Sequence, residues 1–201
     1  MINFKQFLEE QKLKTAVMAF GRMNPPTTGH EKLVDKVHEI AKQHDAHHEV
    51  ILSHSQDAKK NPLSAEDKVK HAKRAFPSTN VRASSKEEPT FLQHAARLHK
   101  EGHEHLIMVA GSDRVDEYKE KLHKYNGTHP GALYNFKKIT VKSAGQRDPD
   151  AEGTEGMSAS KMREHASQGN KQHFMSGAPS KMSDKHKEEL YHDTRAGMGI
   201  K

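Results

Sequence analysis

Two polar segments of the chain, one near residue 30 and one near residue 160, carry side chains that could bind and polarise phosphate groups. Residues 21–30 read Gly-Arg-Met-Asn-Pro-Pro-Thr-Thr-Gly-His and lie between an apolar run and a stretch of apolar residues at helical spacing. Unpaired backbone N–H groups and the positive dipole end make such a helix N-terminus an anion site. Gly29 lets the backbone approach a phosphate closely, and the side chain of His30 could then interact with the negative charge of that phosphate.

The second segment, residues 156–163, reads Gly-Met-Ser-Ala-Ser-Lys-Met-Arg and combines hydroxyl groups with a fixed cation. Ser158 or Ser160 can cap the helix that follows, and both hydroxyls can donate to phosphate oxygens. The planar guanidinium of Arg163 suits the β- and γ-phosphates of a triphosphate. An ordinary Ser cap beside an exposed Arg explains this segment equally well when it is taken by itself.

Together the two segments resemble the signatures of the nucleotidylyltransferase superfamily, whose members join a nucleoside triphosphate to a phosphorylated acceptor. Residues 27–30 are similar to its His/Thr-x-Gly-His motif, and residues 156–163 to its Ile-Ser-Ser/Gly-Thr-x-Ile-Arg motif. The resemblance implies that His30 steadies the α-phosphate in the transition state, that Thr27 orients a phosphate, and that Arg163 binds the departing pyrophosphate. It also implies nucleotide contacts from eight neighbouring residues: Gly21, Arg22, Met23, Asn24, Gly29, Ser158, Ser160 and Met162.

A third segment, residues 53–69, resembles one branch of that superfamily, the archaeal-type nicotinamide mononucleotide adenylyltransferases, in which it reads Ser-His…Asn-Pro-Phe-Thr-Ala-Gly-Glu-Arg-Val. The resemblance makes Lys60 and Asn61 candidates for binding the acceptor. As a purely structural alternative, residues 61–64 form a turn and an N-cap for a helix over 65–76. The departures from the branch include Leu63 in place of an aromatic residue, Glu66 in place of Gly, Lys68 in place of Arg and Thr27 in place of His.

The apolar run 105–110 is the clearest buried strand of the sequence, and three polar or flexible residues follow it closely. Gly111, Asp113 and Arg114 would open on the same crevice, where related enzymes shape an acceptor or base pocket. They are therefore candidates for binding the acceptor phosphate or ribose. A Ser/Asp N-cap for the next helix explains the same residues equally well.

Apolar strand patterns alternate with helical patterns along the chain, which predicts an α/β fold. Strands are expected at 15–20, 49–53, 80–84, 105–110 and 138–142, with helices between them. Helical connections of this length imply right-handed crossovers and a parallel sheet. The resemblance implies a Rossmann-like sheet of five strands in the order 3-2-1-4-5, with the site at the switch between strands one and four.

Composition agrees with one domain and places limits on its function. The 201 residues suffice for a real core, although an apolar content of 32% and a mean hydropathy of −0.99 predict a thin core and a heavily charged surface. The chain has no cysteine, which excludes disulfides and thiolate metal sites. No apolar run approaches the roughly 20 residues of a membrane-spanning helix, so we expect a soluble, cytoplasmic protein that binds no membrane.

The charge distribution fits a polyanionic small molecule better than a nucleic acid. The net charge is +6, but Lys and Arg alternate with Asp and Glu instead of forming one basic tract, and no nucleic-acid-binding motif is visible. A basic rim around a triphosphate pocket explains the same excess. Many of the 17 His residues cluster at 44–48 and 99–105 without a matching carboxylate set, so we predict solvated His residues and no protein metal site.

The ends of the chain and one loop differ from the nucleotidylyltransferase domain expected at 15–166. Residues 1–14 form an N-terminal arm, and its first ten residues resemble the capsid-targeting peptides of tailed-phage head proteins; a helix packed on the domain is the alternative. Residues 167–201 form a helical extension that either packs across the crevice or mediates a homo-oligomer. The loop over 144–155 is a candidate lid. A phage origin would place the protein in the host cytoplasm or in the virion.

These observations predict an adenylyltransferase that transfers AMP from ATP to a phosphorylated acceptor, with nicotinamide mononucleotide as the best guess, and releases pyrophosphate. Mg²⁺ would bind through the triphosphate and need few protein ligands. ATP and CTP both remain open as the nucleotide partner. Alternatives are a cytidylyltransferase, a phosphopantetheine adenylyltransferase, a non-catalytic nucleotide-binding protein and a phage internal head protein.

Overall fold

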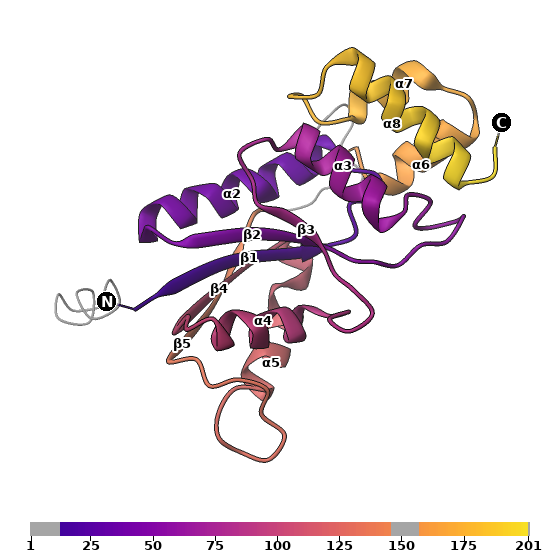
Figure 1. The fold of residues 1–201 in the computed structure, drawn as a ribbon. Coiled ribbons are helices and arrows are strands. Elements are labelled where there is room, and N and C mark those ends of the chain that lie inside the picture. Colours follow the sequence, from indigo (N-terminus) through magenta and orange to yellow (C-terminus); the bar gives the residue numbers. More distant parts are fainter. Residues whose placement is uncertain (1–12, 146–156, 201) are drawn as a thin grey trace.

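Strand β1 (Thr15–Gly21) lies at the centre of a five-stranded parallel sheet with the order β3-β2-β1-β4-β5. The computed structural model describes residues 13–145 and 157–200, and its elements are labelled in Figure 1. Strands β2 (His47–Leu52) and β4 (His105–Ala110) pair directly with β1, whereas β3 (Val81–Ala83) and β5 (Lys138–Ser143) form the edges. The predicted Rossmann-like fold class and strand order are confirmed.

The inner strands are covered on both faces, which explains their nearly continuous apolar sequences. All six residues of β4 and the first five of β1 are buried, as is usual for parallel strands between two helical layers. Strand β5 is an edge strand with half-buried or exposed residues, among them Lys138 and Lys142. Lysines at an open edge hinder pairing with a strand of another molecule.

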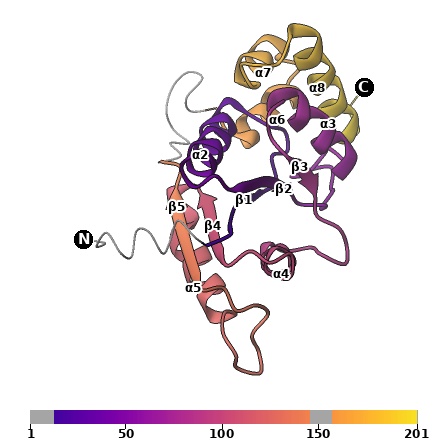
Figure 2. The same ribbon diagram turned by 60° about the vertical axis from the view of Figure 1, so that its left-hand side comes forward.

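Four helices form the two outer layers of the sheet (Figures 1 and 2). Helices α2 (Thr28–His44) and α3 (Ala65–Ala75) cover one face, and α4 (Phe91–Lys100) and α5 (Val115–Lys124) cover the other. Each layer buries its own apolar cluster against the sheet. A short 3-10 turn, η1 (Ser112–Arg114), precedes α5, and it occupies the position where the sequence predicts only an N-cap.

Capping residues set the helix starts close to the predicted positions. The Ser64 hydroxyl accepts a hydrogen bond from the Asp67 backbone N–H at 3.0 Å, which caps α3. Helix α4 begins at Phe91 because Thr90 is its N-cap and forms a capping box with Gln93.

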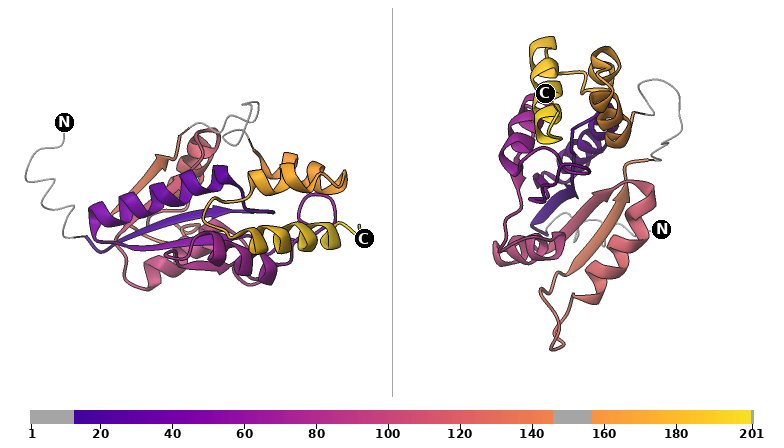
Figure 3. Two further views of the ribbon diagram at one scale, coloured as in Figure 1. Left: turned by 90° about the horizontal axis from the view of Figure 1, so that it is seen from above. Right: turned by 90° about the vertical axis from the view of Figure 1, so that its right-hand side faces the viewer.

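Three further helices make up the C-terminal part of the chain: α6 (Ala159–Ser167), α7 (Lys171–Gly177) and α8 (Asp184–Gly197). They pack together at one end of the sheet, beside α2 and α3 (Figure 3). Phe174 and Leu190 belong to the same apolar cluster as residues of β1 and α2. The predicted helical extension is therefore present and is packed on the core of the sheet domain.

Helix α8 reaches the loop between β2 and α3 through an unusually close contact. A Cβ atom added at Gly197 would lie 2.1 Å from the Pro62 carbonyl oxygen. A glycine within a helix normally costs about 1 kcal/mol relative to alanine. The glycine here lets the helix approach the loop backbone.

Several predictions fall outside the part of the chain that the structure describes. The N-terminal arm and its capsid-targeting resemblance lie almost wholly in residues 1–12, and most of the candidate lid lies in residues 146–156. Within the described ranges, no helix is both long and apolar enough to span a membrane.

Candidate active site

A cavity of about 380 Å³ lies at the carboxyl ends of β1 and β4. The turn between β1 and α2, the start of α6 and the segment after β4 contribute to its wall, so the two sequence segments near residues 30 and 160 meet in one place. All predicted site residues line it except Asn61 and Met162. Those that line it are Gly21, Arg22, Met23, Asn24, Thr27, Gly29, His30, Lys60, Gly111, Asp113, Arg114, Ser158, Ser160 and Arg163.

The orientation of His30 is set by a capping box at the start of α2. The Thr27 backbone N–H donates to Nδ1 of His30 at 3.0 Å, and the Thr27 hydroxyl lies 3.0 Å from the same nitrogen. Because Nδ1 accepts the backbone N–H, the proton of the neutral ring resides on Nε2. Thr27 is 2% exposed. The hydroxyl that sequence reasoning assigned to a phosphate thus orients the imidazole.

Gly29 leaves the first turn of α2 open toward the cavity. It is exposed, and an added Cβ would make only ordinary contacts, the nearest being the Thr27 hydroxyl oxygen at 3.5 Å. Packing within the protein therefore does not require glycine at this position. The lack of a side chain instead gives a ligand access to the backbone N–H groups of the helix N-terminus.

Arg163 joins the two signature segments directly. Its Nη1 donates to the Asn24 carbonyl oxygen at 2.7 Å, and its Nη2 donates to the Ser160 hydroxyl at 3.1 Å. Burial, and then the positive charge of Arg22, hold the pKa of Arg163 below its usual value, whereas Asp57 acts in the opposite direction. The Ser158 hydroxyl caps α6 by accepting the Lys161 backbone N–H at 3.1 Å. Of the two serines, Ser158 is therefore the cap.

Three residues that were predicted to contact a ligand have partners or surroundings within the protein. The Asn24 side chain is 1% exposed and binds the Leu63 backbone, with Nδ2 donating to the carbonyl at 3.1 Å and Oδ1 accepting from the N–H at 3.0 Å. Met162 is fully buried in the apolar cluster and does not reach the cavity. Asn61 is 7% exposed and donates to the Asp57 carboxylate instead of lining the wall.

The segment after β4 forms the opposite wall. Arg114 and Asp113 are exposed there, and Arg114 makes an ion pair with Glu117 at 2.7 Å and lies 5.3 Å from the centre of the Tyr118 ring. Tyr118, one helical turn further on, lines the cavity and was missed by sequence reasoning, as was Lys32 in the first turn of α2. Tyr118 lies four residues after Arg114, and Lys32 lies three residues after Gly29. This helical spacing from a predicted site residue was the signal in the sequence that could have identified them.

The wall of the cavity is strongly cationic. Among the residues that the structure describes, its ionisable lining consists of one carboxylate, Asp113, with His30, Tyr118 and five Lys and Arg residues: Arg22, Lys32, Lys60, Arg114 and Arg163. Such a field raises the local concentration of polyanions. Among residues 13–145 and 157–200, no group of three or more His, Asp or Glu residues could hold a metal ion. This donor set fits a divalent cation that arrives on a triphosphate and keeps its waters.

A parallel sheet in the order 3-2-1-4-5, with a cationic cavity where the order reverses, defines a Rossmann-like protein with a cavity at the switch point. The cytidylyltransferase-like family matches residues 18–165, and the chain belongs to this family. Membership supports nucleotidyltransferase activity in general and confirms the predicted superfamily.

One solved structure shows the extent of the similarity in fold. The bifunctional NMN adenylyltransferase/ADP ribose pyrophosphatase from Francisella tularensis superposes with a TM-score of 0.55 and 13% sequence identity. The match covers 92% of this chain and 53% of the other, so the chain spans about half the length of that protein. No curated protein matches the sequence.

Proposed function

We propose that the protein transfers AMP from ATP to a phosphorylated small-molecule acceptor, with nicotinamide mononucleotide as the first candidate, and releases pyrophosphate. The observation that carries the proposal is the hydrogen bond from Arg163 to the Asn24 carbonyl, which brings both signature segments to one cationic cavity. The fold shared with an NMN adenylyltransferase is compatible with this acceptor.

The chemistry is a single in-line displacement. A phosphate oxygen of the acceptor forms a bond to the α-phosphorus, the bond from that phosphorus to the bridging oxygen breaks, and pyrophosphate leaves with the bonding electrons. The nucleophile is already anionic, so no covalent intermediate with the protein is needed. Catalysis then consists of positioning and charge stabilisation.

The residues of the cavity divide this work between them. His30 donates from Nε2 to the α-phosphate, where charge develops, and the N-terminus of α2 adds its backbone N–H groups. Arg163 and Arg22 bind the β- and γ-phosphates, while Lys60, Asp113 and Arg114 face the acceptor. Mg²⁺, when bound to the triphosphate, neutralises charge on its oxygens.

Pyrophosphate release tests the proposal. ATP and CTP are each incubated with nicotinamide mononucleotide, phosphopantetheine, flavin mononucleotide and sugar or alcohol phosphates in the presence of Mg²⁺. We expect release with ATP and one acceptor and none without an acceptor. Mg²⁺-dependent nucleotide binding without release from any pair would replace the enzyme with a non-catalytic nucleotide-binding protein.

Cytidylyl transfer is the second candidate, because the matching family is described as cytidylyltransferase-like. The two candidates differ only in the base that the cavity accepts, so the phosphate chemistry above serves both. Release with CTP and no release with ATP would select it.

A further inference from the structure

Lys68, on the first turn of α3, is a lysine with 0% exposure and lies outside the residues that line the cavity. A buried ammonium group is costly unless hydrogen bonds satisfy it. Its Nζ donates to the carbonyl oxygens of Ser53 at 2.5 Å and Ser55 at 2.8 Å. Both carbonyls belong to the chain that leaves β2, so the amine lies beneath the loop that leads to Lys60.

The tip of that loop is held together by its own hydrogen bonds. Asp57 and Asn61 pair through two backbone hydrogen bonds of 2.9 and 3.1 Å. The Asp57 carboxylate also accepts the backbone N–H groups of Lys59 at 3.0 Å and Lys60 at 2.6 Å. These bonds hold the pKa of Asp57 at about 2. The tip, residues 57–61, is therefore one hydrogen-bonded unit, and its position depends on the two legs that support it.

Each leg has an anchor inside the protein. The outgoing leg is bound at Leu63 by the Asn24 side chain. The incoming leg is bound at Ser53 and Ser55 by Lys68. It is also held by the Gly21 carbonyl, which accepts the Ser53 backbone N–H at 2.9 Å, and by the Ser84 hydroxyl, which accepts the His54 backbone N–H at 2.9 Å. Lys60 is exposed at the tip and lines the cavity.

We propose that Lys68 is a positioning residue of the active site, which holds the incoming leg of the loop so that Lys60 is presented to a phosphate group of the substrate. The inference rests on the proposed function. Lys68 does not touch the substrate and acts through Lys60. Burial, and then the charge of Arg22, lower the pKa of Lys68 to about 8, whereas Asp57 raises it, so the amine is charged at neutral pH.

The experiment compares Lys68→Met, which removes the donors and keeps the length, with Lys60→Ala and the double variant. Inorganic tripolyphosphate serves as the probe, and its affinity is measured by calorimetry. Lys60→Ala and Lys68→Met should each weaken binding at least about fivefold, because a charged contact is lost or misplaced. The double variant should bind no more weakly than Lys60→Ala within a factor of about two. If the double variant lost affinity by the product of the two single losses, the proposal would be overturned.

Trypsin cleavage gives a readout that does not depend on ligand binding. Lys59 and Lys60 are exposed, so mass spectrometry can follow cleavage after them. Lys68→Met should speed this cleavage about tenfold if the incoming leg is released. An unchanged rate would overturn the proposal.

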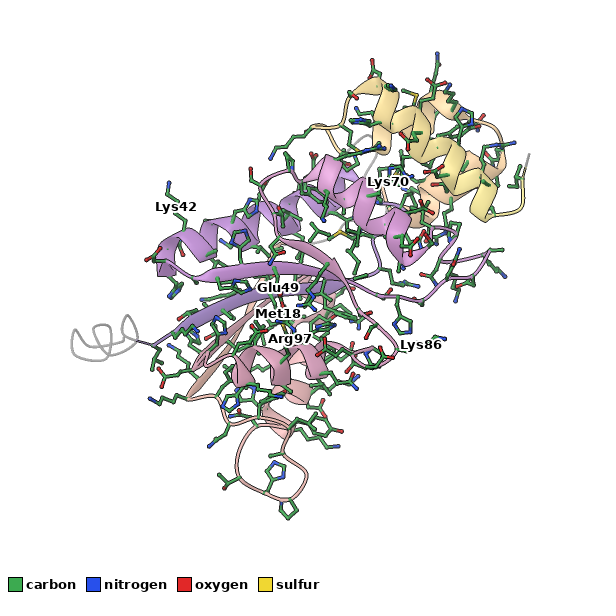
Figure 4. All side chains as sticks on the ribbon, viewed as in Figure 1. Met18, Lys42, Glu49, Lys70, Lys86 and Arg97 are labelled. Atoms are coloured by element: carbon green, nitrogen blue, oxygen red, sulfur yellow. The ribbon has the colours of Figure 1, made fainter. Side chains whose placement is uncertain are left out.

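Lys70→Met is the matched control, because Lys70 lies on the same helix but pairs with Asp193 of α8 at 2.8 Å (Figure 4). It should change both readouts by less than about twofold. If Lys68→Met does not fold, Lys68→Arg, which keeps charge and donors, replaces it and should stay within about threefold of the wild type. If a folded Lys68→Arg variant lost as much affinity for tripolyphosphate as Lys60→Ala, the hydrogen bonds donated by residue 68 would not be what positions the loop.

The two proposals fail in different ways. If the wild-type protein binds tripolyphosphate but releases no pyrophosphate from any substrate pair, the proposed enzymatic activity is refuted. The comparison of the two single variants with the double variant would still test the role of Lys68. A wild type that binds no tripolyphosphate would refute the phosphate site, while the trypsin rates would still report whether Lys68 holds the loop.

Discussion

Two groups of charged residues lie against β2 and are built in opposite ways. On the side of α4, Glu49 is 1% exposed and forms an ion pair with Arg97, which also binds Glu101 at 2.8 Å (Figure 4). On the side of α3 and α6, Arg22, Lys68 and Arg163 gather near the cavity. Among the described residues, no carboxylate lies within ion-pair distance of these three cations, and Asp57 acts on Lys68 and Arg163 only from a distance.

The difference separates structural charge from functional charge. In the Glu49 group, each charged side chain has an oppositely charged partner within the protein. In the cationic group, burial and then repulsion by Arg22 lower the pKa values of Lys68 and Arg163. A polyanion in the cavity would relieve that repulsion. The comparison therefore predicts that changes near Glu49 alter stability and that changes near the cavity alter ligand binding and turnover.

The largest expected effect is on stability. Glu49→Gln leaves the Arg97 guanidinium beside a neutral group in a nearly buried position, and we expect it to lower the free energy of unfolding by about 3 kcal/mol. Urea denaturation measures this loss. Glu101→Gln, at an exposed partner of the same arginine, should cost less than about 1 kcal/mol. Turnover per folded molecule should be unchanged in both variants, and a specific loss of turnover would break the comparison.

His30→Ala should act more on turnover than on stability, although it also removes the capping box at the start of α2. Loss of an N–H donor aimed at the developing charge removes at least about 2.7 kcal/mol of transition-state stabilisation, or roughly a hundredfold in kcat. The pyrophosphate assay measures kcat, and calorimetry should show a smaller loss in nucleotide affinity. Lys42→Ala, an exposed residue near the other end of α2, is the control. An unchanged turnover in His30→Ala would remove this residue from the mechanism.

Arg163→Lys sharpens the comparison by keeping the charge and removing the planar fork. One ammonium group cannot maintain the bonds to the Asn24 carbonyl and the Ser160 hydroxyl while it also binds a phosphate. We expect kcat/KM to fall about tenfold, which corresponds to about 1.4 kcal/mol. A lysine variant with wild-type kcat/KM would show that charge, and not geometry, is what the cavity requires.

The smallest expected effect concerns pH. Burial lowers the pKa of His38, His71, His94 and His103 below the usual value of about 6.5. The unfolded chain then binds more protons than the folded protein below about pH 6.5, so stability is complete above that pH and falls as the pH falls toward the folded-state pKa values. Urea denaturation at pH 7.5, 6.5 and 5.5 should show this decrease.

A substitution identifies the source of the pH effect. His94 is fully buried, so His94→Phe should make stability less dependent on pH between 6.5 and 5.5. His129→Gln, at an exposed position, should leave the dependence as it is. Equal slopes in the wild type and His94→Phe would exclude His94 as a contributor.

The fold was accessible from sequence because its signals are local and repeated. The apolar run of β4 is typical of a buried strand, and Ser64 marks the start of α3. The cavity residues were accessible because the carboxyl ends of neighbouring parallel strands meet. Their separate roles were harder to assign, since Thr27 and Asn24 use their polar groups within the protein.

One error and one unforeseen feature at helical positions have a physical explanation. Met162 and Ala166 are four residues apart on one face of α6, and both are buried, so periodicity would have placed Met162 in the core. Lys68 shares the buried face of α3 with Ala72 and Ala75 at the same kind of spacing. Its burial was not expected, because lysine is almost never fully buried unless partners far along the chain satisfy it.

The contact between Gly197 and the Pro62 carbonyl bears on any attempt to redesign the acceptor preference. A loop transplanted from another transferase would have to place its backbone at the same distance from α8, a helix that lies more than a hundred residues later in the sequence. Exchanging residues 53–64 without α8 would therefore create a collision instead of a new specificity. The loop over residues 53–64 and helix α8 would therefore have to be exchanged together.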